Sequence, residues 1–128
     1  MITQNSKKIL VADDSLFFWA KLSKILVEAG HHVIFAKNGK ETIEKIRIDP
    51  NSIDLLTLDL QMPEVDGYGV LDWIKSNGHG GKFPILVMTG AYEITHIEER
   101  LMSLGASGYM SKDMSPEHII SRVNRFLF

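Results

Sequence analysis

Five polar side chains each follow a short run of apolar residues, directly or within two positions. They are Asp13, Asp14, Asp59, Thr89 and Lys112. Short, continuous apolar runs are typical of strands in a parallel sheet that is covered on both faces. The carboxyl ends of such strands lie along one edge of the sheet, and ligands bind at that edge. We therefore expect these residues, which are far apart in the chain, to meet at one site.

Together these residue types favour phosphoryl chemistry assisted by a divalent cation. Three ionised carboxylates repel one another unless a cation lies among them. Mg²⁺ suits such a site, because it is a hard ion that takes carboxylate and water ligands and serves phosphate chemistry. Lys112 would neutralise one phosphoryl oxygen, and Thr89 would donate a hydrogen bond to another. A carboxylate can also act as the nucleophile itself, which gives an aspartyl phosphate.

Strand and helix patterns alternate five times along the chain. The expected strands cover residues 9–12, 33–36, 53–58, 84–88 and 108–110. The expected helices cover residues 15–29, 40–48, 67–77 and 92–104, with a last helix that starts at Ser115-Pro116. This alternation predicts an α/β domain with a parallel sheet between helices. Periodicity does not give the strand order, but the expected site requires the first and third strands to be neighbours.

Composition narrows the classes of protein that fit. The chain has 128 residues, a net charge of −2 and no cysteine. This length suits a single domain over residues 1–128, and without a basic patch we expect no direct nucleic-acid binding. The lack of cysteine excludes disulfides and thiolate zinc sites. Because residues 1–8 carry no signal-peptide apolar region and no run could span a membrane, we expect a cytoplasmic protein without membrane contact.

Four segments resemble the receiver domain of two-component response regulators. They are VADDS at 11–15, LDLQMPEVDGYGVL at 58–71, ILVMTGA at 85–91 and GASGYMSK at 105–112. They occur in the family's order and at fitting spacings, so the resemblance covers nearly the whole chain. It implies a flavodoxin-like fold, which is a five-stranded parallel sheet of order 2-1-3-4-5 with helices on both faces.

The resemblance implies a phosphorylatable signalling switch and not an enzyme, because the chain would assist only its own phosphorylation and dephosphorylation. Asp59 would accept a phosphoryl group from the phosphohistidine of a sensor histidine kinase or a histidine phosphotransfer protein. Asp14, Asp59 and the backbone carbonyl of Gln61 would bind Mg²⁺ directly. Asp13 would help through a water molecule.

The same resemblance implies how the signal leaves the site. Thr89 and Lys112 would contact phosphoryl oxygens, and Thr89 would form a switch with Tyr109, whose ring turns inward behind the moving hydroxyl. The surface of the fourth helix, fifth strand and fifth helix would then change its affinity for a downstream effector or output domain. Simple packing is the alternative role for Tyr109. Arg122 and Arg125 are expected on the solvated face of the last helix or at a regulated interface.

One position departs from the family pattern, and two others are positions that affect the lifetime of the aspartyl phosphate in the family. Asp113 follows Lys112 where family members often carry a proline with a cis bond, and it adds a negative charge near the site. A cis bond before any other residue costs about 3 kcal/mol, so the sequence leaves this loop geometry open. Gln61 and Ala91 occupy positions that tune the lifetime of the aspartyl phosphate in the family. Ala91 is small and leaves access for water.

An aromatic triplet opens the first expected helix. Phe18 lines up with the apolar stripe of this helix, whereas Leu16 and Phe17 point outward beside the acidic residues. We hypothesise that Leu16 and Phe17 form a docking patch for the helical bundle of the phosphodonor. Partial cover by a neighbouring loop is the alternative.

Three other functions compete with the phosphorylated switch. A phosphohydrolase of the haloacid-dehalogenase type also uses an aspartate nucleophile, but it needs a second aspartate at the position of Gln61. A flavin-binding electron carrier would need a Ser/Thr/Gly loop after the first strand, where Asp13 and Asp14 would repel the flavin phosphate. The third is a receiver-like module that binds partners without being phosphorylated.

Overall fold

The structure is a computed structural model that describes residues 6–128, with side chains described for 6–90 and 97–128. Five parallel strands form one sheet in the order β2-β1-β3-β4-β5. The strands are β1 (Lys8–Ala12), β2 (His32–Ala36), β3 (Leu55–Leu58), β4 (Ile85–Thr89) and β5 (Gly108–Ser111). The helices are α1 (Leu16–Glu28), α2 (Gly39–Ile48), α3 (Gly67–Ser76), α4 (Ala91–Ser103) and α5 (Pro116–Leu127), with a short 3₁₀ helix at Pro50–Ser52. The predicted flavodoxin-like fold and strand order are therefore confirmed.

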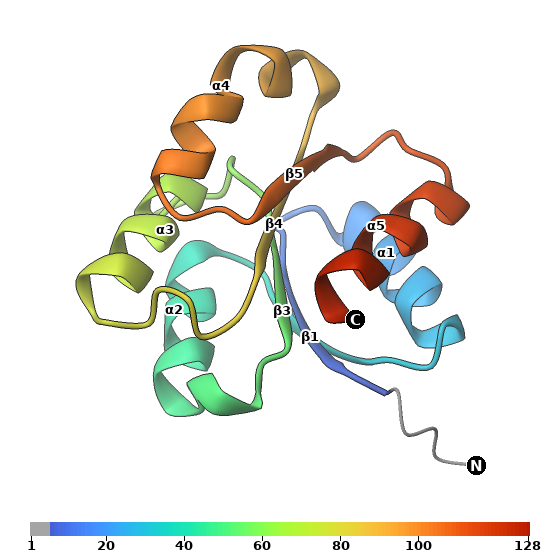
Figure 1. The fold of residues 1–128 in the computed structure, drawn as a ribbon, viewed down its shortest axis with the longest axis horizontal. Coiled ribbons are helices and arrows are strands. Elements are labelled where there is room, and N and C mark those ends of the chain that lie inside the picture. The colour runs from blue at the N-terminus through green and yellow to red at the C-terminus, as the bar shows by residue number, and fades with distance from the viewer. Residues whose placement is uncertain (1–5) are drawn as a thin grey trace.

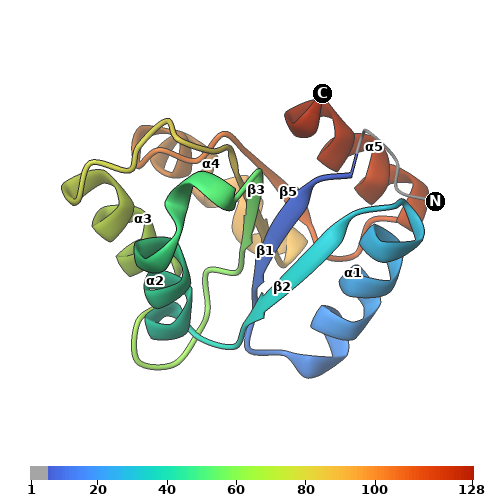
Figure 2. The same cartoon turned by 90° about the horizontal axis from the view of Figure 1, so that it is seen from below.

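Helices cover both faces of the sheet. α1 and α5 lie on one face, and α2, α3 and α4 lie on the other (Figures 1 and 2). Leu55 and Leu56 are adjacent in β3, yet Leu55 packs in the core beside α1 and α5 and Leu56 in the core on the other face. Successive side chains of a strand point to opposite faces, so burial on both sides demands nearly continuous apolar strands. Within the described range, no helix is both long and apolar enough to cross a membrane.

Local polar contacts determine where several elements begin. Four helices start after a residue whose side chain accepts a hydrogen bond from a backbone N–H three residues on: Ser15, Asn38, Asp66 and Ser115. Asn38, predicted to lie in a turn, is thus the N-cap of α2. β3 begins later than predicted, because Asp54 bonds the backbone of Lys8 through both its N–H and its carboxylate, at 2.9 and 2.8 Å.

Candidate functional site

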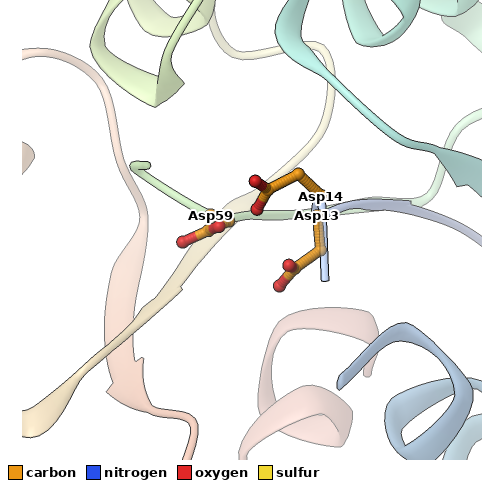
Figure 3. Close-up of side chains that lie close together, drawn as sticks. All are labelled: Asp13, Asp14 and Asp59. Carbon is orange, nitrogen blue, oxygen red and sulfur yellow. The ribbon is translucent and has the colours of Figure 1, made fainter. Parts of the chain in front are cut away.

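Three carboxylates meet at the carboxyl edge of the sheet. β1 and β3 are neighbours with Ala12 opposite Leu58, so the residues that follow them, Asp13 and Asp59, leave the sheet side by side. The backbone N–H of Asp59 donates to the carbonyl of Ala12 at 2.9 Å. One carboxylate oxygen each from Asp13, Asp14 and Asp59 lies within 4.8 Å of the other two (Figure 3). The predicted adjacency of the first and third strands is observed.

The three acids differ in how they are held. Asp14 is exposed, whereas the exposed fractions of Asp13 and Asp59 are 2% and 5%. Oδ1 of Asp13 accepts a hydrogen bond from the Ser15 N–H at 2.9 Å. Among the described residues, the contact of Asp59 Oδ1 is a long one, 3.4 Å, with the N–H of Gln61. Asp13 is therefore anchored by its local backbone, and Asp59 is held more loosely.

Lys112 brings a positive charge into this cluster. Its Nζ lies 2.7 Å from Oδ2 of Asp13 and 3.5 Å from Oδ2 of Asp59. The ammonium also stands over the ring of Phe18, 4.8 Å from the ring centroid. The N–H of Lys112 donates to the carbonyl of Thr89 at 2.9 Å, which ties the end of β5 to the end of β4. Lys112 thus sits between two buried acids that precede it by more than fifty residues in the sequence.

The environment of Asp59 raises its pKa, so its carboxyl group loses its proton less readily than an exposed one. Burial raises the pKa of Asp59 to about 6, and the negative charges of Asp13 and Asp14 add to that rise. Lys112 and the N–H of Gln61 lower the same pKa, but their effect is smaller than that of burial and the neighbouring acids. A further cation among these carboxylates would therefore favour the ionised form of Asp59.

Thr89 and Tyr109 lie on the same face of the sheet. Val87 pairs with Tyr109, and Thr89 pairs with Ser111 in the parallel register of β4 and β5. Because side chains alternate along a strand, Thr89 and Tyr109 project to one side, two residues apart along the register. Thr89 is buried. Tyr109 is half-buried, and its hydroxyl donates a hydrogen bond to the carboxylate of Glu98 on α4.

Gly67 brings the start of α3 against the backbone of Asp59. Its N–H donates to the carbonyl of Leu60 at 2.9 Å. A Cβ at position 67 would lie 2.5 Å from the carbonyl oxygen of Asp59 and 2.7 Å from Cα of Leu60. The sequence predicted Gly67 only as a helix start. The close approach, which depends on β3 and α3 together, was not foreseen.

Replacing Gly67 by alanine is expected to lower the free energy of unfolding by about 2 kcal/mol, because the obstructing atoms are backbone and cannot rotate away. Urea unfolding compares the variant with Gly80→Ala, since a Cβ at position 80 meets nothing within 4 Å. Equal midpoints and slopes for the two variants would contradict the predicted clash.

Leu16 and Phe17 form an exposed apolar patch at the start of α1. Their exposed fractions are 69% and 83%, while Phe18 is buried. The predicted outward direction of both residues is confirmed, and the alternative that a loop partly covers Phe17 is wrong. Met114, in the connection from β5 to α5, is a further exposed apolar residue.

The remaining sequence predictions have mixed outcomes. No peptide bond between described residues is cis, so the Lys112–Asp113 bond is trans. Asp113 is exposed, and its N–H donates to Oγ of Ser111 at 3.1 Å. The side chain of Ala91 lies outside the described residues. Arg122 is not on the solvated face, because it is half-buried and its guanidinium donates to the carbonyl of Tyr109 at 3.1 Å.

Comparison with known proteins shows the family of this chain. A family model for the response regulator receiver domain matches residues 9–124. The chain belongs to this family. This receiver domain is 30% identical over 122 residues to the polar-differentiation response regulator DivK of Brucella anthropi, with 94% of this chain and 96% of DivK covered. It is 34% identical over 123 residues to the alkaline phosphatase synthesis transcriptional regulatory protein PhoP of Bacillus subtilis, with 95% and 49% covered.

The receiver domain therefore spans about half the length of some relatives that it matches and nearly all of others. Among solved structures, the chemotaxis response regulator CheY4 of Vibrio cholerae aligns with a TM-score of 0.83 and 27% identity, covering 95% of this chain and 99% of CheY4. Receiver domains are modules of two-component systems that act as signalling switches and not as classical enzymes. They typically bind Mg²⁺ at an acidic pocket, and the acidic cluster of this chain has the composition of such a pocket.

Proposed function

We propose that Asp59 is the phosphoacceptor of a two-component signalling switch. A carboxylate oxygen of Asp59 attacks the phosphorus of a phosphohistidine on a sensor histidine kinase or a histidine phosphotransfer protein. The O–P bond forms as the N–P bond breaks, and the imidazole nitrogen leaves with the bonding electron pair. The product is an aspartyl phosphate at position 59. We infer that residues 1–128 form the single domain in which this reaction takes place.

The contact distances of the carboxylate oxygens support Asp59, and not Asp13, as the phosphoacceptor. Both oxygens of Asp13 are engaged, one by the Ser15 N–H at 2.9 Å and the other by Lys112 at 2.7 Å. The corresponding contacts of Asp59 are longer, 3.4 Å to the Gln61 N–H and 3.5 Å to Lys112. Asp59 thus combines burial beside a cation with carboxylate oxygens that are engaged less closely than those of Asp13.

The acidic cluster suits Mg²⁺. Asp14, Asp59 and the backbone carbonyl of Gln61 would bind the ion directly, and Asp13 would bind through water. Mg²⁺ prefers oxygen ligands of this kind. One carboxylate oxygen each from Asp13, Asp14 and Asp59 lies within 4.8 Å of the other two. Mutual repulsion among the acids helps to raise the pKa of Asp59, and a bound cation removes that repulsion. When bound, Mg²⁺ supplies charge neutralisation at the phosphoryl oxygens.

The other site residues respond to the new charge. The ammonium of Lys112 shifts from Asp13 to a phosphoryl oxygen, and the hydroxyl of Thr89 donates a hydrogen bond to another. The ring of Tyr109 then turns inward behind Thr89. This movement changes the surface formed by α4, β5 and α5, to which a downstream effector or output domain binds.

The test is incubation with acetyl phosphate, a small phosphodonor, with Mg²⁺ or with EDTA. The intact mass should rise by one phosphoryl group only with Mg²⁺, the added group should resist acid and be lost to hydroxylamine, and fragmentation should assign it to Asp59. A folded chain that takes up no phosphoryl group contradicts the proposal and favours a partner-binding module that is not phosphorylated.

The exposed patch of Leu16 and Phe17 gives a separate prediction about the phosphodonor. Phe17→Ala should slow transfer from the fastest donor of a phosphotransfer profile by about tenfold, because exposed aromatic residues often anchor interfaces. Acetyl phosphate needs no docking surface, so its reaction reports whether the site itself is intact. Val27→Ala is the matched control, since Val27 is also an exposed apolar residue of α1 but lies near its other end. Equal transfer rates for the two variants would remove the docking role.

A further inference from the structure

Glu98 contacts the side chain that is expected to move in the switch. Its carboxylate accepts a hydrogen bond from the hydroxyl of Tyr109 and so joins α4 to β5 at the surface. This hydrogen bond is the main cause of a raised pKa of the Tyr109 hydroxyl, which therefore keeps its proton and remains a donor. Hydrogen bonds with a charged acceptor are stronger than those between neutral groups.

The backbone of Tyr109 is held independently of its ring. β5 pairs with β4 on one side, with Tyr109 opposite Val87. From α5, the guanidinium of Arg122 donates to the carbonyl of Tyr109 at 3.1 Å. With the main chain fixed in this way, the freedom of Tyr109 lies in its side-chain torsions, and the ring can turn without any shift of the strand.

The helix that carries Glu98 is also held from its other side. The guanidinium of Arg100 lies over the ring of Tyr68, which is on α3, at 4.5 Å from the ring centroid. Leu101, which is also on α4, is fully buried in the core between the sheet and the helices α2, α3 and α4. Because these contacts anchor the C-terminal part of α4, Glu98 lies next to a segment of the helix that is fixed in place.

We propose that Glu98 is a positioning residue of the switch, which holds the Tyr109 hydroxyl at the surface and so opposes phosphorylation of Asp59. The inference rests on the proposed function, in which the ring turns inward after phosphorylation. The hydrogen bond between Glu98 and Tyr109 exists only while the ring points outward, and it must be broken before the ring turns inward. The factor by which this bond favours the outward position is therefore also the factor by which it disfavours the phosphorylated form. For an exposed, charge-assisted hydrogen bond this factor is roughly fivefold.

Three variants of α4 test the effect of Glu98. Glu98→Ala removes the acceptor, Glu98→Gln keeps a weaker neutral acceptor, and Glu99→Ala removes the same charge from the next exposed position, which is rotated about 100° around the helix. At sub-saturating acetyl phosphate, the ratio of phosphorylated to unphosphorylated protein should rise roughly fivefold in Glu98→Ala. It should rise less in Glu98→Gln and remain at the wild-type value in Glu99→Ala.

NMR of ¹³C-labelled tyrosine observes the ring directly. In unphosphorylated Glu98→Ala, the Tyr109 ring signal should move toward its position in the phosphorylated wild type, and Tyr109→Phe assigns that signal among the three tyrosines. A double-mutant cycle then separates positioning from a general charge effect. Adding Glu98→Ala to Tyr109→Phe should change nothing further, because the hydroxyl through which Glu98 acts is already gone.

The outcomes that overturn the inference differ from those that overturn the proposed function. If wild type takes up no phosphoryl group at Asp59, the proposed function is wrong. If wild type is phosphorylated but Glu98→Ala behaves like Glu99→Ala, the role of Glu98 is wrong. An effect of Glu98→Ala that persists in the Tyr109→Phe background also overturns that role, because it would be a charge or helix effect that does not pass through Tyr109.

Discussion

Asp59→Asn is expected to abolish phosphorylation and, without divalent cations, to make the protein more stable at neutral pH. The amide has the shape of the carboxylate but is not a nucleophile for phosphoryl transfer. It is also neutral, so it carries neither the desolvation cost nor the repulsion from Asp13 and Asp14 that raise the pKa of Asp59. Loss of function with gain of stability is the signature of a strained functional charge.

The sign of the pH dependence follows from the pKa of Asp59. In the folded protein this pKa is about 6, compared with an ordinary value of 3.8. Between these values the folded state binds more protons than the unfolded state, so stability falls as the pH rises through this window. A shift of two units corresponds to about 3 kcal/mol, which solvent at the sheet edge reduces to about 1–2 kcal/mol. The Asp59→Asn variant would avoid this loss, because its amide does not ionise.

Urea unfolding in EDTA at about pH 4 and pH 7 measures this difference, because most of the Asp59 window, from 3.8 to about 6, lies between them. The stability advantage of Asp59→Asn should be present at the higher pH and nearly absent at the lower. Asp72→Asn is the control, since Asp72 is an exposed acid on α3. Added Mg²⁺ should stabilise wild type more than Asp59→Asn. An advantage that is independent of pH would contradict the role given to the charge of Asp59.

Lys112→Met is expected to destabilise the protein, in contrast to Asp59→Asn. Without the ammonium, the buried carboxylate of Asp13 loses its partner at 2.7 Å, and the pKa of Asp59 loses an influence that lowers it. Removing one member of a buried pair costs several kcal/mol, and the partial exposure of Lys112 reduces this cost to about 2 kcal/mol. The rate of phosphorylation by acetyl phosphate should fall about 100-fold, because no ammonium remains to neutralise the phosphoryl oxygens.

Two controls separate the effect of removing a positive charge from the effect of losing the ammonium at this position. Lys75→Met removes a lysine from an exposed position on α3 and should change neither stability nor phosphorylation. Lys112→Arg keeps the positive charge, so it should recover most of the stability. Its recovery of the rate should be incomplete, because a planar guanidinium does not occupy the place of a compact ammonium. If Lys112→Met phosphorylates at the wild-type rate, Lys112 does not act on the phosphoryl group.

The sequence alone determined the elements of this protein and the class of chemistry at their ends. The run at 55–58, which is apolar except for Thr57, is sufficient to predict a strand buried on both faces, and such nearly apolar runs occur five times. Asp13, Asp59 and Lys112 follow such strands, so their arrival at one edge follows from the geometry of a parallel sheet. The outward direction of Phe17 was also predictable, because it depends only on the rotation of successive residues in a helix.

Only the tertiary structure decided which neighbours these residues meet. Periodicity tells which face of an element is buried but not which other element covers it, so the strand order had to come from family resemblance. The raised pKa of Asp59, the pairing of Lys112 with Asp13 and the contact of Glu98 with Tyr109 all join residues of different elements. Their energies depend on distances of a few ångströms and on solvent exclusion, and these arise only when the elements pack together.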